Sequence, residues 1–147
     1  RAAIAGRELD TVTFVWMQGE RDAREGHGGV YERSLLALVD QLKRDLGRER
    51  LGVVIGRLSP YGLTDPEYPD WAQIRSIQER VAEALDHWRW VDTDPFDRRP
   101  NDGLHFTEEG YRQMGEAFAR SALELIQEPE TGGWFNCLRR ILRKFFG

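Results

Sequence analysis

Hydrophobic residues along the chain occur in two kinds of pattern, short continuous runs and helically spaced sets. The runs are rich in β-branched and aromatic residues and predict buried strands at residues 11–17, 51–58 and 90–93. The spaced sets predict helices at residues 31–46, 70–88 and 107–126. Because strands and helices alternate, we predict an α/β fold, a three-layer α/β/α arrangement around a parallel sheet.

The ends and buried faces of these helices follow from single residues. Asp70 and Thr107 stand where a side-chain oxygen can cap the second and third helices, and Gly26–Gly29 suggests a flexible loop before the first. The predicted buried faces of the second and third helices are Ile74, Ile77, Val81, Leu85 and Trp88, then Tyr111, Met114, Phe118, Ala122, Leu125 and Ile126.

A polar loop follows each predicted strand. The loops begin with Gln18–Asp22, Ser59–Gly62 and Asp94–His105. In open parallel sheets, ligands bind outside the carboxyl ends of the strands. We therefore expect the three loops to share one rim and to hold the functional site.

Composition narrows the class of protein. The chain has 147 residues, a net charge of −4 and 40% hydrophobic residues, which predicts one globular core and disfavours a nucleic-acid binder. Cys137 is the single cysteine, so neither an intrachain disulfide nor a cysteine-based zinc site can form. The aspartates of the third loop lack the spacing of a calcium loop, so we predict no metal and no cofactor.

The last part of the chain differs from the rest. Residues 1–127 form the predicted domain, 128–133 read as a linker, and 134–147 as a cationic amphipathic helix that ends the chain. Two interpretations of residues 134–147 stay open: contact with an anionic membrane surface, or docking on the domain. A foreign, fused segment is a third.

Two short motifs on the predicted rim carry chemistry. Asp102 precedes His105 by three residues, and an acid that orients an imidazole suits a general base in acyl transfer. Gln18 can donate its amide N–H to an oxyanion, Gly19 permits a tight turn, and Glu20 can orient a base. Alone, each motif also fits an ordinary polar turn.

Together the motifs resemble the SGNH hydrolase superfamily, in particular its sialate O-acetylesterase-like branch, which includes carbohydrate esterase family six. That branch has Trp-x-Gln-Gly-Glu-x-Asp-Ala after a strand, and this chain has it at residues 16–23. The branch also ends in Asp-x-x-His before its last helix, and this chain has that motif at residues 102–105. The resemblance covers about residues 1–127.

The resemblance implies a role for each of these residues. His105 would be the base and later the acid, Asp102 would hold its tautomer with Glu20 as the rival, and Gln18 would lie at the oxyanion hole with Gly19 beside it. The reaction would be hydrolysis of O-acetyl esters on a carbohydrate through an acyl-serine intermediate.

The nucleophile motif of the family is missing from this sequence. Its Gly-Gln-Ser-Asn-like turn has no match, and Ser59, which follows a strand, lacks the flanking glycines, so the nucleophile stays unknown. We therefore expect an N-terminally truncated domain without the family's first strands. The strand at 11–17 would then have a bare edge and self-associate.

Two functional hypotheses follow. In the first, the chain is part of a carbohydrate O-acetylesterase and is catalytically incomplete alone. In the second, it is a non-catalytic remnant that binds a partner or a membrane through residues 134–147. The family suggests a secreted or periplasmic protein, but the chain shows no signal peptide, so its location stays unassigned.

Overall fold

The structure is a computed structural model that describes residues 10–100 and 102–128. Strands and helices alternate along the chain, as predicted. In chain order they are β1 (Thr13–Trp16), α1 (Glu20–Arg24), α2 (Gly28–Leu46), β2 (Gly52–Gly56), the 3₁₀ helix η2 (Tyr61–Leu63), α3 (Trp71–Ala84), β3 (Trp88–Val91) and α4 (Glu108–Gln127).

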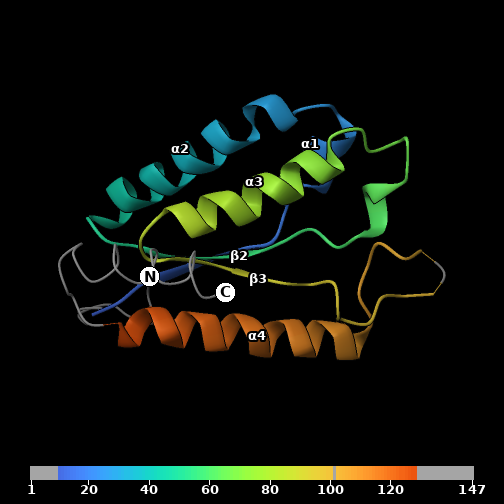
Figure 1. The fold of residues 1–147 in the computed structure, drawn as a ribbon. Coiled ribbons are helices and arrows are strands. Elements are labelled where there is room, and N and C mark those ends of the chain that lie inside the picture. Colours follow the sequence, from blue (N-terminus) through green and yellow to red (C-terminus); the bar gives the residue numbers. More distant parts are fainter. Residues whose placement is uncertain (1–9, 101, 129–147) are drawn as a thin grey trace, which may run out of the picture.

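The sheet of the described residues is parallel and has the order β1-β2-β3. Phe14 pairs with Val53 across the first ladder, and Val53 pairs with Trp88 across the second. Helices α2 and α3 cover one face and α4 covers the other (Figure 1). The predicted three-layer α/β/α fold is therefore confirmed.

Each face of the sheet has its own core. The larger one lies under α2 and α3, where side chains such as Val39, Ile55 and Ile74 are almost fully buried. The smaller one joins Val54 and Val91 to α4. Strand residues alternate between the two cores because successive side chains point to opposite faces.

The end of α3 corrects one prediction. Trp88 does not belong to the helix but opens β3, where it is buried, and Leu85 lies beyond the last helical residue and is 37% exposed. His87 has a φ of 63°, in the left-handed region, which turns the chain out of the helix direction. Its carbonyl then accepts a hydrogen bond from the N–H of Val53.

The start of α2 corrects another prediction, because the helix already begins at Gly28, inside the predicted flexible loop. Asp70, the residue before α3, makes no cap bond to its own helix. Its carboxylate instead accepts the N–H of Gly28 at 2.7 Å. A Cβ on Gly28 would lie 2.6 Å from the Gln73 side-chain oxygen and 2.9 Å from the Asp70 carboxylate, so a larger residue would displace these side chains.

Helix α4 begins at the predicted residue, but fewer of its apolar side chains are buried than predicted. The Thr107 hydroxyl caps it by accepting the N–H of Gly110 at 3.0 Å. Met114 and Leu125 are buried, whereas Tyr111 and Ile126 are 48% and 46% exposed. The helix packs on β2 and β3, so its flanking side chains have no layer to enter.

Candidate active site

Three loops meet at the carboxyl ends of the strands, as the alternating fold requires. In Figure 1 they lie at the right-hand end of the sheet, where α1, η2 and the chain between β3 and α4 come together. The loops after β2 and β3 also touch, since a Cβ on Gly103 would lie 3.3 Å from the Tyr61 ring. The predicted shared rim therefore exists and carries the predicted site residues.

Asp102 and His105 form a closed turn. One carboxylate oxygen, Oδ1, accepts the backbone N–H groups of Leu104 and His105 at 3.0 and 2.8 Å. The other, Oδ2, lies 3.1 Å from Nδ1 of His105. Gly103 has a φ of 64°, a conformation that glycine adopts without strain. The side chain of His105 is 57% exposed, so Nε2 is accessible to a ligand.

The electrostatics of the turn favour an ionised aspartate. The backbone N–H of His105, followed by its imidazole, lowers the pKa of Asp102 below its ordinary value. A carboxylate facing Nδ1 favours the tautomer with the hydrogen on Nδ1 and the lone pair on Nε2. In that tautomer, Nε2 is the hydrogen-bond acceptor of the His105 ring.

Both sides of this turn are anchored. The Arg99 N–H donates to the His105 carbonyl, and the Gly103 N–H donates to the Arg99 carbonyl, both at 2.8 Å. Next to it, Phe106 is 4% exposed, and the N–H of Thr107 donates to the Asp97 carbonyl at 2.9 Å. The loop before α4 is therefore a folded structure that holds His105 in place.

The Gln18–Gly19–Glu20 motif lies at the end of β1, where α1 begins. The Gln18 amide nitrogen donates to Asp22 at 3.0 Å, and the Gly19 N–H donates to the Glu20 carboxylate at 2.9 Å. The Glu20 carboxylate thus binds its own backbone turn, and the carboxylate beside His105 is that of Asp102. Of the two rivals that sequence suggested, Asp102 has the geometry to orient the base.

Sequence reasoning missed four residues that build the rim. Gln78 and Tyr31 bind the Gln18 carbonyl, Arg75 binds the Leu58 carbonyl, and Tyr61 lies against Gly103. Gln78 and Arg75 are polar residues on the apolar face of a helix, at 0% and 9% exposure. The sequence did offer a signal for these two residues, because a glutamine and an arginine there share the helical spacing of the buried isoleucines.

Charged residues next to the rim pair with one another. Arg75 makes two hydrogen bonds of 2.9 Å to Asp94, and Arg57 contacts Asp92, Asp94 and Glu79. Burial alone would raise the pKa of Asp94, but the hydrogen bonds and charge of Arg75 outweigh it and lower that pKa. Arg57 is thus part of an ion-pair network.

None of the chain's four serines is presented as a nucleophile. Ser34 and Ser76 lie on the exposed sides of α2 and α3, and Ser121 lies on α4. Ser59 is on the rim but 3% exposed, and its hydroxyl accepts the N–H of Tyr61 at 3.4 Å. The Ser59 hydroxyl is therefore buried and turned into its own loop.

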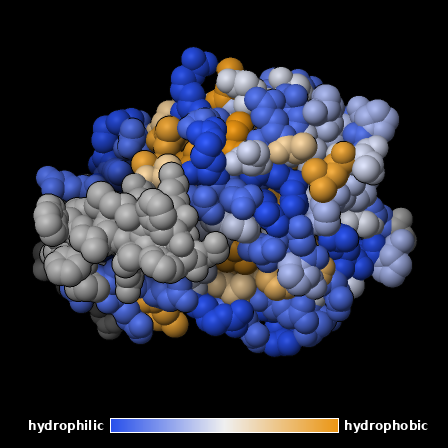
Figure 2. Space-filling model, viewed as in Figure 1, coloured by the Kyte–Doolittle hydropathy of each residue, from blue (hydrophilic) through white to orange (hydrophobic). Residues whose placement is uncertain are grey.

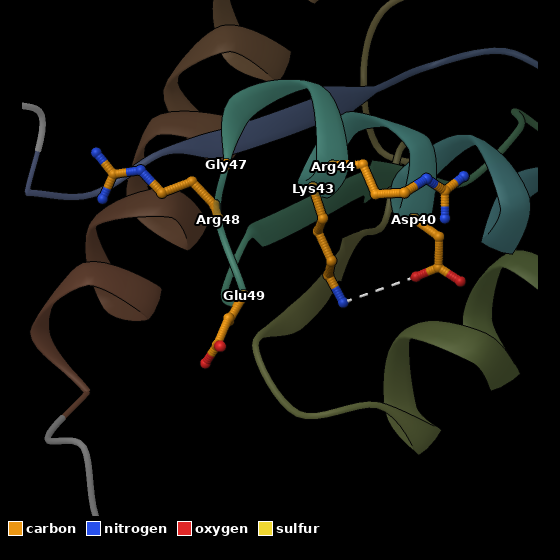
Figure 3. Close-up of a pocket in the computed structure, with 6 residues that line it drawn as sticks. All are labelled: Asp40, Lys43, Arg44, Gly47, Arg48 and Glu49. Carbon is orange, nitrogen blue, oxygen red and sulfur yellow. Dashed lines mark ion pairs between the residues drawn. The ribbon is translucent and has the colours of Figure 1, made fainter.

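A surface hollow lies away from the rim, at the C-terminal end of α2 (Figure 3). It is lined by charged side chains, and Lys43 pairs with Asp40 beside it. This end of α2 leads into the start of β2, so the hollow is at the amino ends of the strands. It therefore does not belong to the candidate site.

Two other kinds of feature are absent from residues 10–100 and 102–128. This part of the chain holds no group of three or more potential metal ligands. It also contains no helix of the length and apolar character that a membrane span requires. The segment 134–147, for which membrane contact was one interpretation, lies outside the described residues.

Fold and site together define a class of protein: a three-layer α/β protein with an aspartate–histidine pair on the carboxyl rim of its sheet. The family model "Carbohydrate esterase, sialic acid-specific acetylesterase" matches residues 1–124, a range that contains both rim motifs. The chain belongs to this carbohydrate esterase family. No curated protein matches the chain.

A solved structure supports the fold independently. The chain is similar to a protein from Arabidopsis thaliana determined by X-ray crystallography, with a TM-score of 0.67 and 23% sequence identity. The similarity covers 84% of this chain and 47% of the Arabidopsis chain. This chain thus spans about half the length of that relative, whose likeness concerns the fold.

Proposed function

We propose that the rim of this chain is the acid–base part of a carbohydrate O-acetylesterase site. The observation that carries the proposal is the Asp102–His105 pair, with 3.1 Å between Oδ2 and Nδ1 and an exposed imidazole. Membership of the acetylesterase family supports an acetyl ester on a sugar as the substrate, and an O-acetylated sialic acid is the first to try.

The proposed chemistry starts at Nε2 of His105. This nitrogen takes a proton from the attacking hydroxyl as its oxygen bonds to the acetyl carbon, and Asp102 stabilises the imidazolium. The carbonyl oxygen then becomes an oxyanion. The tetrahedral intermediate breaks its bond to the sugar oxygen, which receives the proton back from Nε2.

Gln18 and Gly19 are the proposed oxyanion donors. An amide nitrogen carries two hydrogens, so the bond from Gln18 to Asp22 leaves a second for the oxyanion. The Gly19 N–H is held by Glu20 in the free protein, so the oxyanion must displace that carboxylate. We assign Glu20 to this donor and not to His105.

These 147 residues do not contain the serine motif that supplies the attacking hydroxyl in the family. Because the serines lie on helices or are buried, we propose that water attacks when the chain acts alone. An acyl-serine route, which the family resemblance implies, would need a serine in a motif that this sequence does not contain. We therefore expect slow turnover.

The experiment measures hydrolysis of p-nitrophenyl acetate by the chain and by His105→Ala. General base catalysis accelerates a reaction by about 10²–10⁴-fold. The protein-dependent rate of the variant should therefore be lower than that of the wild type by at least about tenfold. Acetate release from an O-acetylated sialic acid, followed with the same variants, tests the carbohydrate.

His27→Ala is the matched control. His27 is 56% exposed and faces Asp22 at 3.8 Å, so it resembles His105 in exposure and in having a carboxylate neighbour. Its removal should leave the rate unchanged. Equal small losses in both variants would mean ordinary surface imidazole chemistry and would reject the proposed site; the binding-remnant hypothesis would then be preferred.

A further inference from the structure

We propose that Gln78 and Tyr31 are positioning residues that fix the direction of the Gly19 N–H at the rim. This inference rests on the proposed function for its catalytic meaning, because Gly19 is there an oxyanion donor. The structural part of the proposal is that two buried side chains orient one peptide group. This part rests only on the hydrogen bonds of Gln78 and Tyr31.

Gln78 is a polar side chain in the middle of the larger core. It is 0% exposed, and both ends of its amide are used. Its oxygen accepts the N–H of Leu58 at 2.9 Å, and its nitrogen donates to the Gln18 carbonyl and to the Tyr31 hydroxyl, both at 3.0 Å. A buried amide is costly unless it is paired, so these bonds define how it is oriented.

The Gln18 carbonyl receives a second hydrogen bond. The Tyr31 hydroxyl donates to it at 2.8 Å, and that hydroxyl also accepts the indole N–H of Trp16 at 3.2 Å. Burial raises the pKa of the Tyr31 hydroxyl, so it remains a donor. Two donors from two helices therefore hold one carbonyl oxygen in the core.

The position of this carbonyl determines where the next N–H points. A trans peptide is planar, and its C=O and N–H lie on opposite sides of the chain. With the Gln18 oxygen fixed toward the core, the Gly19 N–H is directed away from it, where it meets the Glu20 carboxylate at 2.9 Å. The two buried side chains thereby present an N–H donor to an anionic oxygen.

The fit of Gly19 against α3 leaves little room for another arrangement. Its φ is 150°, and a Cβ at this position would lie 3.0 Å from Ile74 and 3.3 Å from Leu58. The peptide is thus pressed on the helix that carries Gln78. A rotated peptide would lose both donors to the Gln18 carbonyl.

Helix α3 orients the neighbouring loop as well. Gln78 accepts the Leu58 N–H, and Arg75, one helical turn earlier, donates to the Leu58 carbonyl. The N–H and the carbonyl of Leu58 are therefore both held by one helix. The loops after β1 and β2 have a common support, and a change at Gln78 should move both.

Gln78→Glu is the variant that tests the proposal, because it keeps the size and exchanges the donor. The introduced carboxyl group can still donate to the Gln18 carbonyl when it is protonated, whereas the carboxylate cannot. Burial favours the neutral acid, and so do Glu20 and Asp22 on α1, which also raise the pKa of the neighbouring Tyr31 hydroxyl on α2. The charge of Arg75, which shares Leu58 with Gln78 on α3, favours the carboxylate. The peptide should therefore be correctly held at low pH and released as pH rises.

Two readouts separate positioning from stability. The amide resonance of Gly19 in a ¹⁵N–¹H spectrum should match the wild type at pH 5 and depart from it by pH 8. At pH 8 the His105-dependent rate should fall by at least about tenfold, since losing one oxyanion donor costs about 10²–10³-fold. Tyr31→Phe should move the same Gly19 resonance.

Ile77→Ala and Gln41→Glu are the controls. Ile77 is buried on the same helix next to Gln78, so its variant lowers stability without touching the Gln18 carbonyl; Gln41 is exposed on α2. Neither should give a pH-dependent Gly19 resonance. If Gly19 keeps its wild-type resonance both in Gln78→Glu at pH 8 and in Tyr31→Phe, the positioning proposal is wrong. If Gly19 moves and no His105-dependent rate exists even in the wild type, the proposed function fails and the orientation of the peptide stands.

Discussion

The two carboxylate oxygens of Asp102 have different roles in the Asp102–His105 turn. Oδ1 accepts two backbone N–H groups and shapes the turn, whereas Oδ2 faces the imidazole. A neutral amide can replace the first function, because its oxygen still accepts. It cannot replace the second, because it lacks the charge that stabilises an imidazolium.

Asp102→Asn should therefore separate folding from chemistry. We expect the His105-dependent hydrolysis of p-nitrophenyl acetate to fall at least about tenfold, because the base loses its partner. The thermal midpoint should stay close to the wild type, since the turn keeps its acceptor. A variant that lost stability and kept its rate would contradict this division.

Contacts between residues that are close together in the chain could be predicted from the sequence. Asp102 and His105 lie three positions apart, so their contact needs only one turn and their motif is visible in the chain. Gln78 contacts Gln18 and Leu58, which lie 60 and 20 positions away. No local pattern encodes such contacts, and on the helix Gln78 simply shares the spacing of buried apolar residues.

At the scale of elements, the start of α4 fixes the loop that carries His105. Gly110 lies so close to the Asp97 carbonyl that a Cβ would be 2.2 Å from its oxygen. Gly115, five residues later, has no atom within 4 Å of such a Cβ. The two glycines of one helix thus differ in whether an added methyl group has room.

Gly110→Ala and Gly115→Ala should consequently have opposite effects on stability. At Gly110 the backbone must shift, and overpacking costs about 1–3 kcal/mol. At Gly115 alanine should stabilise by about 0.5–1 kcal/mol, because glycine is the poorer helix former. Urea denaturation measures both free energies of unfolding. Destabilisation of equal size in both variants would show that the Asp97 contact is not the cause.

Element boundaries were predicted less well than element types. The helices and strands have the predicted order, but Trp88 was assigned to a helix and proved to open β3. The spacing of Trp88 from Val81 and Leu85 fits a helix. The left-handed conformation that ends the helix is at His87, and because this residue is not a glycine the sequence does not indicate a turn there. The start of α2 at Gly28 was missed for a similar reason, since the carboxylate that binds its N–H comes from Asp70.

At the scale of the whole molecule, most of the exposed residues in the described part of the chain are polar. Figure 2 shows hydrophilic side chains over most of the visible face, with apolar residues in small groups. An exposed apolar residue of interest is Val15 on β1, at 44% exposure, because β1 is an edge of the described sheet. Unpaired strand edges favour association with a second chain.

Self-association through β1 stays a prediction that light scattering can measure. We expect the apparent mass to rise with protein concentration and Val15→Lys to reduce that rise, because charge on an edge strand opposes pairing. Val30→Lys is the matched control, with 41% exposure on α2. A concentration-independent monomer, or an equal effect of both variants, would exclude pairing through this edge.

The stability of the whole chain should depend on pH through Asp94. Arg75 lowers the pKa of Asp94 below its ordinary 3.8, so this pair stabilises the fold above that pH and its contribution is lost as pH falls through the folded value. Asp94→Asn should lower the thermal midpoint at pH 7 and differ less from wild type at pH 3. Asp40→Asn, at an exposed pair, is the control. A difference that stayed constant with pH would contradict this assignment.

The proposed site requires that the loops after β1 and β3 act on one ligand, and titration with an O-acetylated sialic acid measures this. In a ¹⁵N–¹H spectrum we expect the amides of Gly19 and His105 to shift together and to give the same dissociation constant. Shifts at only one of the two loops would contradict a shared site. Shifts confined to the hollow beside Lys43 would place the ligand at the opposite end of the sheet and reject the proposed function.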